Sequence, residues 1–270
     1  MGEWIPFSLL LMHTRNTFMN ATIMNSRTSP LIYARTGGVL YLIIIIIGLF
    51  NEIFIRTKLI VPADATATAS NLMASEQLWR LGFTGSIVML MCAIPLALIM
   101  FVLLRPVNNH IALLALLFNL VSISVEAVSD LSIFAALFPL SGSNYLNAFE
   151  PQQLNVLSYL TFRMHASGYN ISLVFFGMNC FFWGYLVYKS VYFPKIIGVL
   201  LMICAVCYVT NSFAWFLAPK FAATLVPAIL VPCLIAELSL CLWLMIKGVQ
   251  MPIWENRVNG IQTTEATNEI

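Results

Sequence analysis

Apolar runs dominate the chain, and six of them are long enough to cross a bilayer as helices. A helix of about 20 apolar residues crosses a hydrocarbon core of roughly 30 Å. No polar and apolar alternation marks these runs, and in lipid a continuous apolar segment satisfies its backbone groups only as a helix. The pattern therefore predicts an all-α fold, a polytopic membrane protein with about six transmembrane helices in one bundle. The predicted spans are Gly38 to Ile55, Leu81 to Leu104, Ile111 to about Phe134, Ala166 to Tyr188, Ile196 to Phe216 and Ala222 to Ile246.

Composition supports the same class. Of the 270 residues, 60% are hydrophobic and 9% are charged, and the mean hydropathy is +0.90. A soluble domain of this length does not have such a composition, and the low basic charge argues against nucleic acid as a partner. The expected partners are the lipid bilayer and an unknown small molecule, proton or lipid.

The six runs define one transmembrane domain over residues 31–250. Residues 1–30 are expected to be an N-terminal extension, with Met24 as a candidate for the native start, because their charge pattern does not fit a signal peptide. Residues 251–270, which end in the polar stretch TTEATNEI, are expected to form a disordered cytoplasmic tail.

Lysine and arginine in the short loops predict the orientation, because the cytoplasmic side carries the excess. With six spans both termini lie on one side, and that side holds eight basic residues against five on the other. Both termini are therefore predicted to be cytoplasmic. The eight are Arg15, Arg27, Arg35, Arg105, Lys189, Lys195, Lys247 and Arg257, and the five are Arg56, Lys58, Arg80, Arg163 and Lys220.

Polar residues within the spans are the candidates for function, because charge inside a bilayer is costly and therefore rare. The third span carries Asn119, Ser122, Glu126, Ser129 and Asp130 at three- and four-residue spacing, which places them on one helix face. Glu126 and Asp130 lie one turn apart and repel each other when both are ionised. We expect this face to bind a proton or counter-ion, or to form a buried hydrogen-bond ladder.

The remaining candidates lie on other spans. The fourth is preceded by Arg163 and His165, which we expect at the outer boundary, and Arg163 is the arginine that we expect to serve the acids. His165 and Tyr169 share one face of that helix. The candidate substrate- or ion-binding residues are Glu52, Glu126, Asp130, Arg163, His165, Tyr169, Asn170, Asn211 and Glu237.

Two loops carry helix-start signals. Asp64 is a plausible N-cap for an interfacial helix that leads into the second span, either a lid over the polar residues or an ordinary connector. Pro151 is well placed to open the helix that follows the third loop. Pro227 and Pro232 lack backbone donors and could kink the sixth span near Glu237.

Motifs for cofactors and metals are missing. The spans offer only His165, at the edge of the fourth, which is too few for a histidine-rich metal enzyme, and Walker, Rossmann and zinc-binding patterns do not occur. The six cysteines all fall within predicted spans, so a disulfide framework is not expected. We predict no cofactor and no metal, and catalytic residues are not assigned.

Three segments together resemble a known family. They are the stretch from Gly38 to Phe83, HASGYNISLVFFGMNCFFWGYLVYKS and LSLCLWLMIKGV. In combination they resemble the bacterial membrane-protein family called domain of unknown function 4386, over about Leu31 to Val249. The resemblance implies six or so helices in a bacterial plasma membrane, and it brings no established activity or site.

Three functions remain open. The first is a proton- or cation-coupled carrier of a small molecule, which the spread of acids over several helices favours. The second is a membrane-embedded enzyme that acts on a lipid or isoprenoid, with His165 as acid or base. The third is a non-catalytic accessory or sensor protein whose polar residues only hold the helices together. Because catalytic residues converge on one place while these acids lie on several helices, the carrier is favoured over the enzyme.

Overall fold

A computed structural model of the chain describes residues 29–250, 253–256 and 258. Apart from a few positions, the expected N-terminal extension (1–30) and the expected tail (251–270) lie outside the described residues. Within the described ranges the chain is helical and contains no strand, and six helical segments are long and apolar enough to cross a membrane. The predicted fold class is confirmed.

The bounds of the helices are as follows. The long ones are α2 (Pro30–Phe50), α5 (Glu76–Leu104), α6 (Asn109–Ala135), α7 (Pro151–Lys189), α8 (Lys195–Leu217) and α10 (Val231–Ile246). A π-helical turn, η1 (Asn51–Arg56), and α3 (Thr57–Leu59) continue α2. The short ones are α4 (Ala65–Ala74), η2 (Asn144–Ala148), α9 (Pro219–Leu225) and η3 (Ala228–Leu230).

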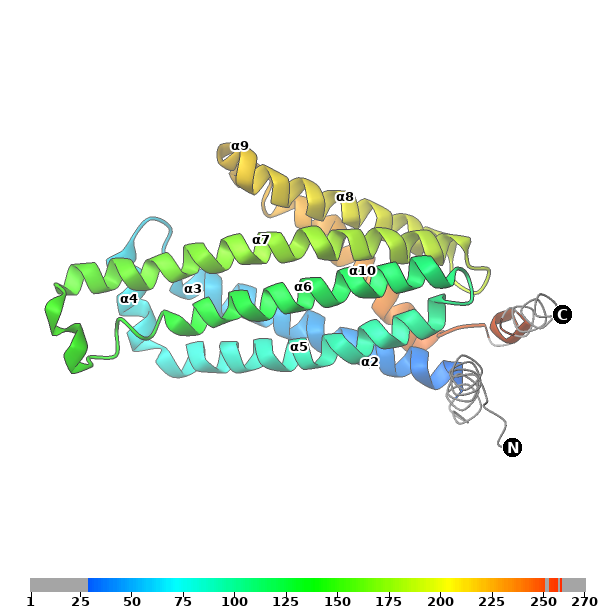
Figure 1. Cartoon of the computed structure of the whole chain (residues 1–270), viewed down its shortest axis with the longest axis horizontal. Coiled ribbons are helices and arrows are strands. Elements are labelled where there is room, and N and C mark those ends of the chain that lie inside the picture. Colours follow the sequence, from blue (N-terminus) through cyan, green and yellow to red (C-terminus); the bar gives the residue numbers. More distant parts are fainter. Residues whose placement is uncertain (1–28, 251–252, 257, 259–270) are drawn as a thin grey trace, which may run out of the picture.

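The six long helices form a closed ring. Each packs against the next along the chain, from α2 through α5, α6, α7 and α8 to α10, and α10 packs back against α2. In Figure 1 the start of α2 and the end of α10 lie at one end of the bundle, here called the termini end, and α4 lies at the opposite end, the α4 end. Large apolar side chains such as Met91, Val128 and Val206 point outward and are exposed, as lipid-facing residues are.

Two apolar clusters fill the ends of the bundle. The larger occupies the termini end and includes Met100, Trp183 and Leu244. The smaller occupies the α4 end and includes Leu72, Trp79 and Phe162. Between them, polar side chains such as Ser86, Asp130 and His165 occupy the interior.

Helix α7 is much longer than a bilayer crossing. Its 39 residues correspond to about 58 Å at 1.5 Å per residue, against a hydrocarbon core of roughly 30 Å. It begins at Pro151, as predicted, and not at the expected span boundary Ala166. A capping box in which the Gln153 side chain accepts from the Glu150 backbone N–H at 2.9 Å fixes this start.

The helix-start signal at Asp64 is also confirmed. Asp64 accepts a hydrogen bond from the Ala67 backbone N–H at 2.9 Å and caps α4, which then leads into α5. The Tyr159 hydroxyl accepts from the Ala63 backbone N–H at 2.9 Å, and α4 packs on α7. The loop between the first two spans is thus fastened to the extended part of α7.

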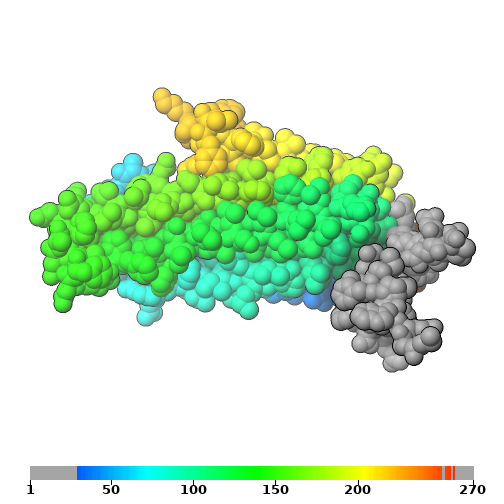
Figure 2. All heavy atoms as spheres, in the orientation of Figure 1, coloured from blue at the N-terminus to red at the C-terminus, as the bar shows by residue number. Residues whose placement is uncertain are grey.

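The sixth span is not the continuous helix from Ala222 that the apolar run predicts. The chain forms α9, turns at Pro227, and starts α10 at Val231 with Pro232 in its first turn. Proline lacks the N–H that a helix interior needs, so these prolines break the run. Figure 2 shows α9 standing away from the α6–α7 face of the molecule.

Glycines allow α7 and α8 to approach at backbone contact. A Cβ on Gly198 would lie 2.6 Å from the Gly184 carbonyl oxygen, and one on Gly184 would lie 2.7 Å from the Gly198 carbonyl oxygen. Small residues at a helix crossing permit this closeness, which favours helix association in lipid.

We expect Gly198→Ala to lower the free energy of unfolding by about 1–3 kcal/mol, because the methyl group would push two backbones apart. Thermal unfolding in detergent measures the loss. Gly48→Ala is the matched control, since the nearest atom to a Cβ there is Met89 Sδ at 4.0 Å. Equal melting temperatures for the two variants would contradict the packing argument.

Candidate functional site

The first helix does not end at Ile55 as predicted, because it continues through the π-helical turn to Leu59. Residues five apart lie about 140° apart around a regular α-helix, whereas i→i+5 bonding brings them toward one side. Asn51 and Ile55, four residues apart, are both buried, and the π-helical turn brings Arg56, five residues after Asn51, to a half-buried position beside them. Arg56 thus lies on a helix that faces the bundle and not in a loop.

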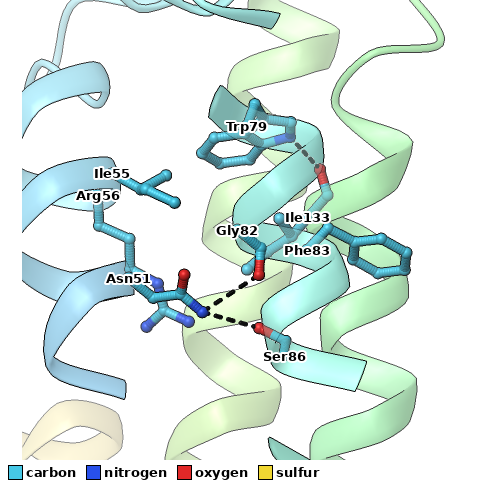
Figure 3. A pocket seen from close by; sticks show the side chains of 8 residues that line it. All are labelled: Asn51, Ile55, Arg56, Trp79, Gly82, Phe83, Ser86 and Ile133. Carbon is cyan, nitrogen blue, oxygen red and sulfur yellow. Dashed lines mark hydrogen bonds between the residues drawn. The ribbon is translucent and has the colours of Figure 1, made fainter. Parts of the chain in front are cut away.

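Asn51 joins this turn to α5. Its Nδ2 donates to the Gly82 carbonyl oxygen at 3.2 Å and to Ser86 Oγ at 3.1 Å. Its Oδ1 is buried and has no hydrogen-bond partner within the described residues. Figure 3 shows this oxygen at a small pocket between η1 and α5, with the Arg56 guanidinium beside the amide.

The pocket has an apolar side as well as a polar one. Asn51, Arg56 and Ser86 form the polar side. Trp79 closes the α4 end of the pocket and donates its indole N–H to the Ile133 carbonyl oxygen at 3.1 Å. The apolar lining residues are Ile55, Trp79, Phe83 and Ile133.

Asp130 and His165 meet inside the ring, on α6 and α7. His165 Nδ1 lies 3.6 Å from Asp130 Oδ1 and 3.2 Å from the Ser129 carbonyl oxygen. The shorter contact indicates that Nδ1 carries the proton and donates to Ser129, which leaves Nε2 as an acceptor. Asp130 is 3% exposed and His165 6%. Within the part of the chain that the structure describes, Asp130 Oδ2 and His165 Nε2 have no hydrogen-bond partner.

Tyr169 lies between Arg56 and the Asp130–His165 pair, and contacts both Arg56 and His165. The Tyr169 ring stacks on His165 at 5.9 Å between ring centroids, and the Arg56 guanidinium lies over the Tyr169 ring, 5.6 Å from its centroid. Arg56 is within electrostatic range of Glu126, Asp130 and His165. The expected face of His165 and Tyr169 on α7 is present, and its cationic neighbour is Arg56.

Glu126 lies one turn below Asp130 on the same face of α6, as the spacing predicts. Ser172 of α7 donates to Glu126 Oε2 at 3.4 Å and pairs with Ser122 Oγ at 2.9 Å. Glu126 is also within electrostatic range of Asp130 and Glu237. The acids of α6 therefore lie near the acid of α10.

Glu237 receives a hydrogen bond from the Tyr208 hydroxyl of α8 at 2.5 Å. Next to this pair, Asn211 of α8 donates to Asn170 Oδ1 of α7 at 3.3 Å. Both asparagines are buried, so this amide pair connects α8 to α7 at the level of the polar groups.

Arg163 and Glu52 lie at the edge of this arrangement. Arg163 is exposed and its guanidinium lies over the Trp215 ring at 5.2 Å; the expectation that it serves the acids is wrong. It fails because the π-helical turn brings Arg56 inward while Arg163 faces away from α6. Glu52 is exposed and pairs with Arg56 at 3.6 Å.

A group of interior polar residues contributed by several helices is here called the polar band; other buried polar side chains, such as Ser158 and Asn179, are not part of it. On η1, α5, α6 and α7 the members of the band lie between a member of one apolar cluster and a member of the other, as Ser86 lies between Leu96 and Trp79. The band comprises Asn51, Arg56, Ser86, Ser122, Glu126, Ser129, Asp130, His165, Tyr169, Asn170, Ser172, Tyr208, Asn211 and Glu237. Within the described ranges, no group of three or more histidines, cysteines or acids is arranged to hold a metal ion.

Comparison with known proteins agrees with this architecture. The profile of the family described as "Domain of unknown function (DUF4386)" matches residues 36–248. The chain belongs to this family. It is also 26% identical over 169 residues to a protein of Archaeoglobus fulgidus named "Uncharacterized protein", an alignment that covers 61% of this chain and 82% of the relative. No solved structure matches the chain.

Several residues of the polar band in this family member were not among the candidates from the sequence, and Arg56, Ser86 and Tyr208 are the most informative of them. Arg56 follows Glu52 by four residues, a helical spacing that indicates a continued helix. Ser86 lies in an apolar run with no polar neighbour one turn away, so only the packed structure assigns it a partner. Tyr208 precedes the candidate Asn211 by three residues, a spacing that places both on one helix face and could have identified it.

We expect Tyr208→Phe to lower the free energy of unfolding by about 1–3 kcal/mol, because Glu237 loses its hydrogen-bond donor. Thermal unfolding measures the effect, with Tyr145→Phe, at an exposed tyrosine of η2, as control. In a Glu237→Leu background the same change should cost much less. A cost that is unaltered in that background would assign it to another contact of the tyrosine.

Proposed function

We propose that the protein is a carrier that moves a small polar molecule across the membrane together with a proton or cation, and that the polar band is its binding site. The observation that carries the proposal is the position of the band's members on η1, α5, α6 and α7 between two apolar clusters, while Tyr208 and Glu237 lie against the larger cluster. A solute held at this level would be separated from water on both sides, which a carrier requires when it exposes its site to one side at a time. The proposal includes a bacterial plasma membrane location with both termini in the cytoplasm.

The charges of the band support coupling to a proton or cation. Glu126, Asp130 and Glu237 bring three carboxylates to the interior, and Arg56 brings one guanidinium. Uncompensated negative charge in a low-dielectric interior is unfavourable. Binding of protons or of a cationic group would neutralise this excess negative charge. The acids lie on two different helices, α6 and α10, as successive proton-binding positions of a transport pathway would.

His165 gives a second candidate function specific support. A histidine whose Nδ1–H is held by a carbonyl oxygen and whose Nε2 is an unpartnered acceptor, within the described residues, has the arrangement of a general base. A membrane enzyme acting on a lipid or isoprenoid would use it in this way. That reading also needs an opening for an acyl chain beside a residue that is 6% exposed, so the carrier is preferred.

The decisive test uses the full chain in liposomes that enclose the pH indicator pyranine. Small amino acids, carboxylic acids and amines are added outside in turn, and the internal pH is recorded. We expect at least one class to drive proton movement above that of protein-free liposomes. Glu126→Gln and Glu237→Gln should reduce this movement at least about tenfold, since each removes a proton-binding group.

Glu76→Gln is the matched control, because this acid is partly exposed and paired with Arg80 outside the band; it should transport like the native protein. If no class moves protons, the carrier proposal fails. Loss of turnover of an added lipid in His165→Ala, without any flux, would instead support the enzyme. Lower melting temperatures alone in all the variants would support the accessory role.

A further inference from the structure

The end of the polar band that faces α4 is rich in unused hydrogen-bond acceptors. Asn51 Oδ1, Asp130 Oδ2 and His165 Nε2 have no partner among the described residues, and all three side chains are more than nine-tenths buried. Asn51 donates to Ser86, whose hydroxyl is placed to donate to the Asp130 carboxylate, and Asp130 lies beside His165. A buried acceptor without a donor costs free energy, so this group favours a ligand with several N–H donors.

Arg56 supplies the opposite property at the same place. Its ion pair within the described chain is with Glu52 at 3.6 Å, and the Glu52 side chain is 64% exposed, so the pair contributes little. The guanidinium has five N–H donors in a planar fork that matches a carboxylate. It also borders the pocket that Asn51 and Ser86 line (Figure 3).

The interior carboxylates that act electrostatically on Arg56 make no ion pair with it among the described residues. Asp130 and Glu126 are within electrostatic range of Arg56, yet neither forms an ion pair with it in the described part of the chain. Opposite charges held apart in a low-dielectric interior would gain from a dipolar molecule between them. A carboxylate would face Arg56 and an ammonium group would face Asp130.

We propose that the polar band binds a small zwitterion of the amino-acid type, with its carboxylate on Arg56 and its ammonium group on Asp130 and neighbouring acceptors. This deepens the proposed carrier function and rests on it. The pocket beside Arg56 has room for about one water molecule in this conformation, so η1 and α5 would have to move apart to admit even a compact amino acid. Its apolar lining would then face a short aliphatic side chain.

The test measures binding to the purified full-length protein in detergent by isothermal titration calorimetry. L-Alanine is compared with L-alaninamide, which lacks the carboxylate, and with L-lactate, which lacks the ammonium group. We expect both analogues to bind at least about tenfold more weakly than L-alanine, because each leaves one buried charge without its partner. If either analogue binds as tightly as L-alanine, or L-alanine does not bind, the inference is overturned.

Two variants assign the contacts. Arg56→Gln should bind L-alanine and L-alaninamide equally, and Asp130→Asn should bind L-alanine and L-lactate equally, while Arg80→Gln and Glu76→Gln keep the native preferences. Arg56→Lys retains the charge and should restore part of the preference for a carboxylate. A native preference that persists in Arg56→Gln would overturn the assignment. Because analogue preference is also read on the native protein, poor folding of a variant leaves the main test intact.

The outcomes separate this inference from the carrier proposal. Proton movement driven by amines or carboxylic acids, with no binding of L-alanine, would overturn the zwitterion and leave the carrier. Selective binding of L-alanine without any flux in liposomes would support the site and overturn the carrier.

Discussion

The enclosure of ionisable groups within an apolar bundle is the constraint on which the rest of this structure depends. Arg56, Glu126, Asp130 and Glu237 lie inside a ring of helices whose outer faces are apolar. A charge at the centre of a bilayer costs at least about 2.5 kcal/mol on insertion scales. The ring therefore has to close around these four side chains.

Close contact between α6 and α7 is what brings the polar groups together. A Cβ on Gly168 would overlap Ser129 Oγ and lie 2.9 Å from Ser129 Cβ, so glycine favours this approach. The approach lets His165 reach the Ser129 carbonyl oxygen and lets Ser172 pair with Ser122. The glycines where α7 meets α8 act in the same way, so α7 is the helix against which its neighbours in the ring are aligned.

The spacing of apolar and polar residues correctly predicted the features that depend on a single helix. The six helices, the face shared by Glu126 and Asp130, the cap at Asp64 and the start at Pro151 all follow from local spacing. The cationic partner was wrongly predicted, because a π-helical turn changes which side Arg56 faces, and no hydropathy pattern reports that change. The break before α10 was also missed as a boundary, since Pro227 and Pro232 were taken to kink a helix that in fact ends.

The polar band is divided between two parts of the ring. Asp130, His165 and Arg56 belong to the group formed by α2, α5, α6 and α7, whereas Glu237 and its donor Tyr208 belong to α10 and α8. Glu126 is within electrostatic range of acids in both parts. Any displacement of the α8–α10 pair would change the distance between Glu126 and Glu237, and with it the free energy of having both ionised. Proton occupancy and helix position are therefore physically linked in this arrangement, whichever solute occupies the band.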